Sequence, residues 1–229
     1  MSSVPTDPIK FFHSQFPDIV LRSICRGIDS AHITAEAYFK DNAFTPEQRH
    51  DALPGLRRAH VERNTISVLG RYSNVKVTTL ANTSGNAFHN RIACGRVFLT
   101  ISAVTSPSEM VREAAFRQTY AFSQNLDLFT GRSEPTADSS LYGIVLHGPA
   151  ARPATEEAWA EARKQGLRFD RPAFIQIAFP DQELRAYLTE PINLLARFPD
   201  LFRDDEDGGQ IEKPKAPVLS PVPEVGTDK

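Results

Sequence analysis

The chain has 229 residues, of which 41% are hydrophobic and 24% are charged, and its formal net charge is −2. A chain of this length and composition can fold around one hydrophobic core of ordinary size. It contains no apolar run of membrane-spanning length, and Met1 to Pro8 lack the basic and apolar regions of a signal peptide. We therefore expect a cytoplasmic protein that does not engage a membrane.

The two cysteines, Cys25 and Cys94, are far apart in the sequence and neither belongs to a Cys-x-x-Cys motif. Each stands next to an apolar residue, which is typical of a reduced cysteine in a protein core. The alternative is a single disulfide in an extracellular protein, because disulfides follow the redox compartment.

Charge is distributed unevenly along the chain. Residues 204–229 contain seven acidic residues and three lysines, which leaves 21 acidic and 23 basic residues in residues 1–203. The same C-terminal stretch has four prolines and no aromatic residue. Such a segment buries too little apolar surface to offset the entropy of ordering. We therefore predict one domain over residues 1–203 and a disordered acidic tail over residues 204–229.

Helix signals fill the first part of the domain, about residues 7–70. Asp7-Pro8 and Pro17-Asp18 place proline where a first helical turn accepts it, and Gly27 is expected to end the second helix. A third helix is predicted over Ser30 to Lys40. Thr45 and Gln48 have the spacing of a capping box, so a further helix begins there. Leu53-Pro54-Gly55 is expected to break it before a following helix reaches Leu69.

Strand signals begin after residue 71. Val75 to Leu80 and Val97 to Val104 alternate with period two, and Asn82 to Asn86 between them are turn residues. These two segments predict a β-hairpin. Ser106 and Glu109 then have capping-box spacing and predict the start of a helix.

Leu141 to His147 and Ala173 to Phe179 are almost continuously apolar, which is typical of strands covered on both faces. Thr155 can cap a helix between them, so the segment predicts a parallel βαβ unit. Residues 191–198 predict a short closing helix. The expected fold class is α+β: a helical N-terminal part followed, over about residues 71–203, by a helix-packed mixed sheet of about four strands.

The most unusual stretch runs from Arg63 to Ser108, because these 46 residues contain no Asp or Glu. The average acid content of the chain would place between five and six there. A stretch of this kind can form a positive surface that attracts phosphate groups, and an aromatic side chain beside it can stack on a base. We therefore predict a non-enzymatic binding or regulatory module that engages nucleic acid or another polyanion. The residues assigned to this surface are Arg57, Arg58, Arg63, Arg71, Lys76, Phe88, His89, Arg91 and Arg96.

Two alternatives remain open. A metal-independent phosphodiester hydrolase would use His89 and His147 for proton transfer, provided that the two segments meet in space. An adaptor would dock an acidic protein partner on the same basic surface. Asp204 to Asp207 of the tail could compete with either ligand for that surface.

Cofactor and metal motifs are missing from the sequence. No glycine-rich phosphate-binding loop and no metal-ligand spacing of His or Cys occurs, so we expect neither a cofactor nor a metal. Asp181 and Glu183 could hold a hard cation between them, but Pro180-Asp181 is expected to form a turn instead.

Overall fold

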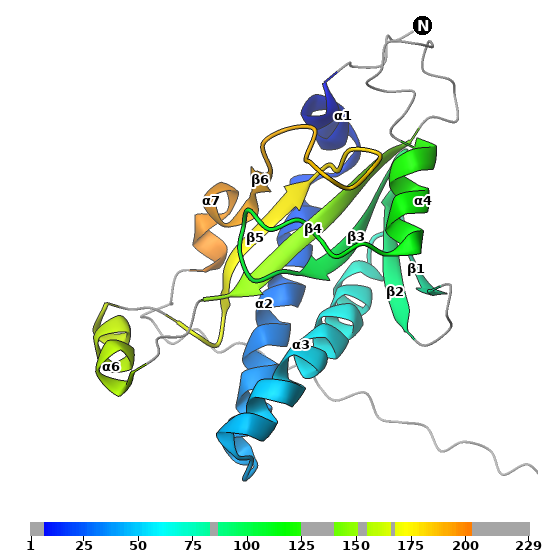
Figure 1. Ribbon diagram of the computed structural model, residues 1–229. Helices are drawn as coiled ribbons and strands as arrows, with labels where there is room; N and C mark the ends of the chain where they lie inside the picture. Colours follow the sequence, from blue (N-terminus) through cyan, green and yellow to red (C-terminus); the bar gives the residue numbers. More distant parts are fainter. Residues whose placement is uncertain (1–6, 83–86, 125–139, 151–154, 166–167, 203–229) are drawn as a thin grey trace, which may run out of the picture.

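The computed structural model describes residues 7–82, 87–124, 140–150, 155–165 and 168–202 (Figure 1). The predicted acidic tail at residues 204–229 lies outside these residues. Within them, no helix is both long and apolar enough to cross a bilayer. The elements in chain order are α1 Pro8–Gln15, α2 Asp18–Asp41, α3 Pro46–Leu69, β1 Val75–Ala81, β2 Phe88–Cys94, β3 Val97–Ala103, α4 Ala115–Gln124, β4 Leu141–Pro149, α6 Glu156–Lys164, β5 Pro172–Ala178, β6 Ile192–Asn193, α7 Leu194–Arg197 and the 3-10 helix η1 Pro199–Leu201.

The helical N-terminal part has the predicted start signals but longer helices than predicted. Thr45 forms the expected capping box with Gln48, and Asp7 caps α1. Gly27 does not end a helix: α2 continues through it, and a Cβ there would lie 3.3 Å from Val68 of α3, so this glycine lets the two helices approach. Pro54 does not break α3, because it lies on the exposed side of the helix, where water can satisfy the carbonyl group freed by the proline.

All six strands form one mixed sheet in the order β1-β2-β3-β4-β5-β6, so the prediction of about four strands was too low. The two strands that the sequence failed to predict are β2 and the short β6. β2 was missed because it contains His89, Asn90 and Arg91, which are unusual in a strand that lies inside a sheet.

The predicted pairing of the first strands was wrong. β1 does not pair with β3; it pairs antiparallel with β2, and β2 pairs antiparallel with β3. The tight β2–β3 connection is made possible by Gly95, whose φ of 56° suits a residue without a side chain. The β1–β2 connection is closed by Asn82, whose backbone and side chain both bond to Ala87.

The predicted parallel βαβ unit was also wrong. β4 and β5 are antiparallel, with Ile144 opposite Ala178 and Pro149 opposite Pro172. Since the chain leaves β4 and enters β5 at the same end of the sheet, no crossover is needed. The parallel pair is β3 and β4, in which Val97 lies opposite Leu141. The long connection between those two strands contains α4.

Two predicted helices are shorter than expected. No helix begins at Ser106: Glu109 instead accepts hydrogen bonds from the backbone and hydroxyl groups of Thr105, and this closes a turn. The helix of this segment begins only at Ala115. In the closing segment, β6 occupies residues 192–193 and α7 only residues 194–197.

The sheet is buried on both faces. One face packs against α1, α2, α3 and α7 in a large apolar core that contains Phe12, Ile24, Leu99 and Val145. The other face packs against α4 and residues 104–111 in a smaller core built around Phe98 and further residues of β4 and β5. Both cysteines are buried and free, as predicted for reduced core residues.

Candidate functional site

The nine residues assigned to a basic surface do not all lie together. Arg57 is buried and forms ion pairs with Glu36 of α2, which also binds Arg49. Its charge is therefore used to hold α2 against α3. A buried cation that is already paired has little to offer a ligand.

Three other predicted residues point elsewhere. Arg63 is exposed on α3 but lies five residues beyond Arg58, which is a rotation of about 140° around the helix. Arg71 follows the end of α3, about 20 Å along the helix axis from Arg58, and donates to the carbonyl of Val68. Arg96 lies in the β2–β3 turn, with its guanidinium 5.5 Å from the ring of Phe11.

Lys76, His89 and Arg91 do share one face, because the β1–β2 register places them there. Lys76 is opposite Ala93, and Thr78 is opposite Arg91. Side chains of opposed residues lie on the same face of a sheet. Ala93 packs in the core on the α4 side, so the side chains of Lys76, His89 and Arg91 all belong to that face. They extend over about 13 Å of strand.

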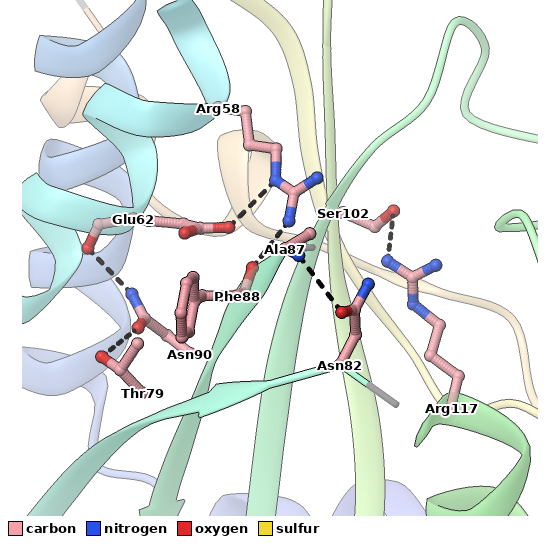
Figure 2. Close-up of polar contacts among 9 residues, drawn as sticks. All are labelled: Arg58, Glu62, Thr79, Asn82, Ala87, Phe88, Asn90, Ser102 and Arg117. Atoms are coloured by element: carbon pink, nitrogen blue, oxygen red, sulfur yellow. Dashed lines mark hydrogen bonds and ion pairs between the residues drawn. The ribbon is translucent and has the colours of Figure 1, made fainter. Parts of the chain in front are cut away.

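Two arginines from helices complete this group at the end of β2. Arg58 of α3 donates from Nη2 to the carbonyl of Phe88 at 2.6 Å, and Nε lies 3.1 Å from the Glu62 carboxylate. Arg117 of α4 donates from Nη2 to the Ser102 hydroxyl at 3.1 Å. Figure 2 shows the two guanidinium groups reaching toward the same end of β2 and β3. We call Arg58, Lys76, His89, Arg91 and Arg117 the basic face.

Arg117 was not among the predicted site residues, although the sequence carries a signal for it. It precedes the fully buried Ala121 by four residues, so both lie on the core-facing side of α4. A cation in that position of an amphipathic helix is unusual and indicates a specific role. Burial lowers the pKa of Arg117, and Tyr142 opposes this effect, so the guanidinium remains charged.

His89 is held by aromatic side chains of α4. Its ring stacks on Phe116 at 3.8 Å between centroids with an interplanar angle of 11°, and Nε2 lies 3.5 Å from the Tyr120 hydroxyl. Only 6% of the residue is exposed. Burial lowers the pKa of His89, and the positive charges of Arg117 and Arg58 lower it further. The ring is therefore neutral at pH 7.

Arg91 and Phe88 lie on opposite faces of β2. The Arg91 guanidinium lies 4.5 Å over the ring of Phe98, an aromatic contact that leaves its charge unneutralised. Phe88 immediately precedes His89 in β2, so its ring lies on the opposite face of the sheet, on the α3 side, where the residue is 55% exposed. Asn90 fixes the strand beneath by donating to the Glu62 carbonyl at 2.9 Å and accepting from Thr79 (Figure 2).

The basic face carries a net positive charge. Its arginines and lysine supply four permanent cations, and among the described carboxylates only Glu62 forms an ion pair with it. The resulting charge is +3 with His89 neutral. None of β1, β2 and β3 contains an acidic residue, so the strands add no compensating charge.

His147 does not join this site. It lies on the opposite face of the sheet, where Nδ1 is 3.0 Å from Nε2 of His32 in α2. Burial and the charge of Arg57 lower its pKa to about 4, so it is neutral at pH 7. The structure therefore does not bring His89 and His147 together, as the predicted hydrolase requires. Among the described residues, no three His, Cys, Asp or Glu side chains are grouped so as to hold a metal ion.

Comparison of the chain with protein-family models, curated proteins and solved structures gave no match. The function must therefore be inferred from the residues of the site.

Proposed function

We propose that this protein is a binding or regulatory module that engages a polyanion, with single-stranded nucleic acid as the preferred ligand, through the basic face. The observation that carries this proposal is that Arg58 and Arg117 reach the end of β2 that contains His89, with Glu62 as the only carboxylate paired there among the described residues. Cations gathered in this way attract phosphate groups and raise association rates.

The dimensions of the face fit a strand of nucleic acid. Lys76 and Arg91 continue the positive charge along β1 and β2 from the end where Arg58 and Arg117 lie. About 13 Å of strand is long enough to meet more than one phosphate. The exposed ring of Phe88 lies on the other face of β2, at the strand end where Arg58 binds the Phe88 carbonyl, and supplies a stacking surface for a base at that end, a contact that tolerates any sequence.

The test is a fluorescence-anisotropy titration of the full chain with a labelled single-stranded oligonucleotide at low salt. We expect binding that Arg58→Gln weakens by roughly tenfold, because a charge-assisted contact to phosphate is lost. Arg63→Gln is the matched control: it removes the same charge from the same helix on a different side, and it should change the affinity much less.

An unrelated acidic protein with a net charge similar to that of the oligonucleotide serves as the competitor for the basic face. If it displaces the oligonucleotide at equal charge concentration, the surface is an adaptor for acidic proteins and the nucleic-acid proposal is wrong. If Arg58→Gln and Arg63→Gln weaken binding equally, the interaction is a general attraction to the whole molecule and the basic face has no special role.

A further inference from the structure

Strands β2 and β3 separate at the end of the basic face where Arg58 and Arg117 lie. The β2–β3 ladder comprises only Ile92 with Leu99, Ala93 with Phe98 and Cys94 with Val97. Beyond these pairs the two strands diverge (Figure 1). Arg58 binds the backbone of β2 in this region and Arg117 binds a side chain of β3 in the same region (Figure 2). We call Arg58, His89 and Arg117, which reach this place from α3, β2 and α4, the cation cluster.

The cluster contains two buried nitrogen atoms that lack hydrogen-bond partners among the described residues. Nδ1 of His89 and Nε of Arg117 are buried, and neither finds a hydrogen-bond partner among the described residues. Buried polar groups in folded proteins are nearly always bonded, so an unbonded donor in a well-packed place requires an explanation. An anion with several acceptor oxygens would accept a hydrogen bond from Nε of Arg117, and one from Nδ1 of His89 when that nitrogen carries a proton.

The three side chains of the cluster also influence one another's protonation. The charges of Arg117 and Arg58 both oppose protonation of His89, and the charge of Arg58 opposes that of Arg117. The groups facing His89 are Leu80 of β1, Phe116, Arg117 and Tyr120 of α4, and Arg58 of α3, whose own partner is Glu62. Two positive charges therefore act on the imidazole, one of which, Arg58, is paired with the Glu62 carboxylate. A doubly charged anion at this place would relieve the repulsion and draw a proton onto His89.

We propose that the cation cluster holds one terminal phosphate group, a phosphate monoester at the end of a nucleic-acid strand. This inference rests on the proposed function, because it assigns the part of the polyanion that the cluster binds. A monoester has three free oxygens and a charge between about −1.5 and −2 at pH 7, whereas an internal diester has two free oxygens and a single charge. Three donors from three different elements match the terminal group better than the internal one.

The experiment compares oligonucleotides of one sequence that carry a phosphate at the 5′ end, at the 3′ end or at neither end. The full chain should bind one of the two phosphorylated forms roughly tenfold more tightly than the unphosphorylated form. Arg117→Gln, His89→Gln and Arg58→Gln should each reduce this ratio toward one. Of these three variants, Arg58→Gln should disturb folding least, because the Arg58 side chain is 55% exposed. Arg63→Gln should keep the ratio of the wild type.

A second measurement follows the imidazole of His89 by NMR during titration with inorganic phosphate. A shift toward the protonated form, with saturation, is expected for a phosphate site and identifies free phosphate as a competing source of the same group. Equal affinity for all three oligonucleotides, with binding intact, overturns the phosphate site and leaves the proposed function standing. Failure to bind any oligonucleotide overturns the proposed function, and the NMR titration then decides the phosphate site alone: a saturable shift supports it, and an unchanged His89 overturns it.

Discussion

Replacing Lys76 by Gln should weaken the salt dependence of nucleic-acid binding by a defined amount. Lys76 lies on the basic face, is exposed, and pairs with no described carboxylate. The basic face has four permanent cations, and each phosphate neutralised on a single strand contributes about −0.7 to the slope of log affinity against log salt. The wild-type slope should therefore be about −2.8, and that of Lys76→Gln about −2.1.

These slopes translate into a large difference over an accessible range. Raising the salt concentration fourfold, from about 50 to about 200 mM, should lower the affinity about 50-fold for the wild type and about 20-fold for Lys76→Gln. Anisotropy titrations at four salt concentrations measure both slopes. Lys10→Gln is the matched control, because Lys10 is exposed on α1, which packs against the other face of the sheet. If both lysine variants have the wild-type slope, Lys76 does not contact the ligand and the basic face is smaller than proposed.

Three further predictions concern stability. Glu36→Gln removes the carboxylate charge that pairs with the buried Arg57 and should lower the free energy of unfolding by about 3 kcal/mol in a urea titration; a loss below about 1 kcal/mol would show that the ion pair is dispensable. Burial lowers the pKa of His32 in α2 to about 2 and that of His147 in β4 to about 4, from the usual 6.5. As the pH falls, the unfolded chain therefore takes up protons before the folded chain does. Stability should be fully present above pH 6.5 and fall toward pH 4 by up to about 1.4 kcal/mol per pH unit for each histidine, and His32→Gln should reduce this slope. Gly148→Ala places a Cβ 2.3 Å from the backbone oxygen of Val104 and should lower the free energy of unfolding by about 1–3 kcal/mol. In Gly55→Ala the new Cβ on α3 meets no atom within 4 Å, so this variant should be more stable than the wild type. Melting temperatures equal to that of the wild type would contradict both expectations.

The sequence predicted local structure more reliably than pairing. The capping box at Thr45 and the apolar β4 and β5 segments have the predicted structure, because each depends on neighbouring residues alone. The direction of β5 depends on which end of the sheet the chain enters, and no local pattern records that. A rule that favours parallel crossovers therefore gave the wrong pairing of β4 with β5.

Gly27 and Pro54 were misjudged for a related reason. Both are helix breakers by intrinsic preference, yet α2 and α3 run through them. The close packing of the two helices at Gly27 compensates for the low helix propensity of glycine. At Pro54 the cost falls on the exposed side, where solvent reduces it. Tertiary packing of long amphipathic helices overrides single unfavourable residues.

The absence of acidic residues between Arg63 and Ser108 predicted positive charge but could not predict where it would point. In the strands the register decides: Lys76 on β1 and the cationic residues of β2 fall on one face because opposed residues share a face. In helix α3 and in the turns, positions a few residues apart face different directions, so Arg63, Arg71 and Arg96 leave the group.

The two arginines that complete the cation cluster both lie outside that acid-free stretch. Arg58 comes from the middle of α3 and Arg117 from α4, on opposite sides of the stretch in sequence. They reach one place because α3 packs beside β2 on one face of the sheet and α4 covers the other face, and because the β2–β3 ladder stops at Ile92 and Leu99. The phosphate site proposed here is therefore a product of the topology. The charge pattern of the sequence identified Arg58, Lys76 and Arg91, but it missed Arg117 of α4, the second of the two guanidinium groups on which terminal phosphate recognition depends.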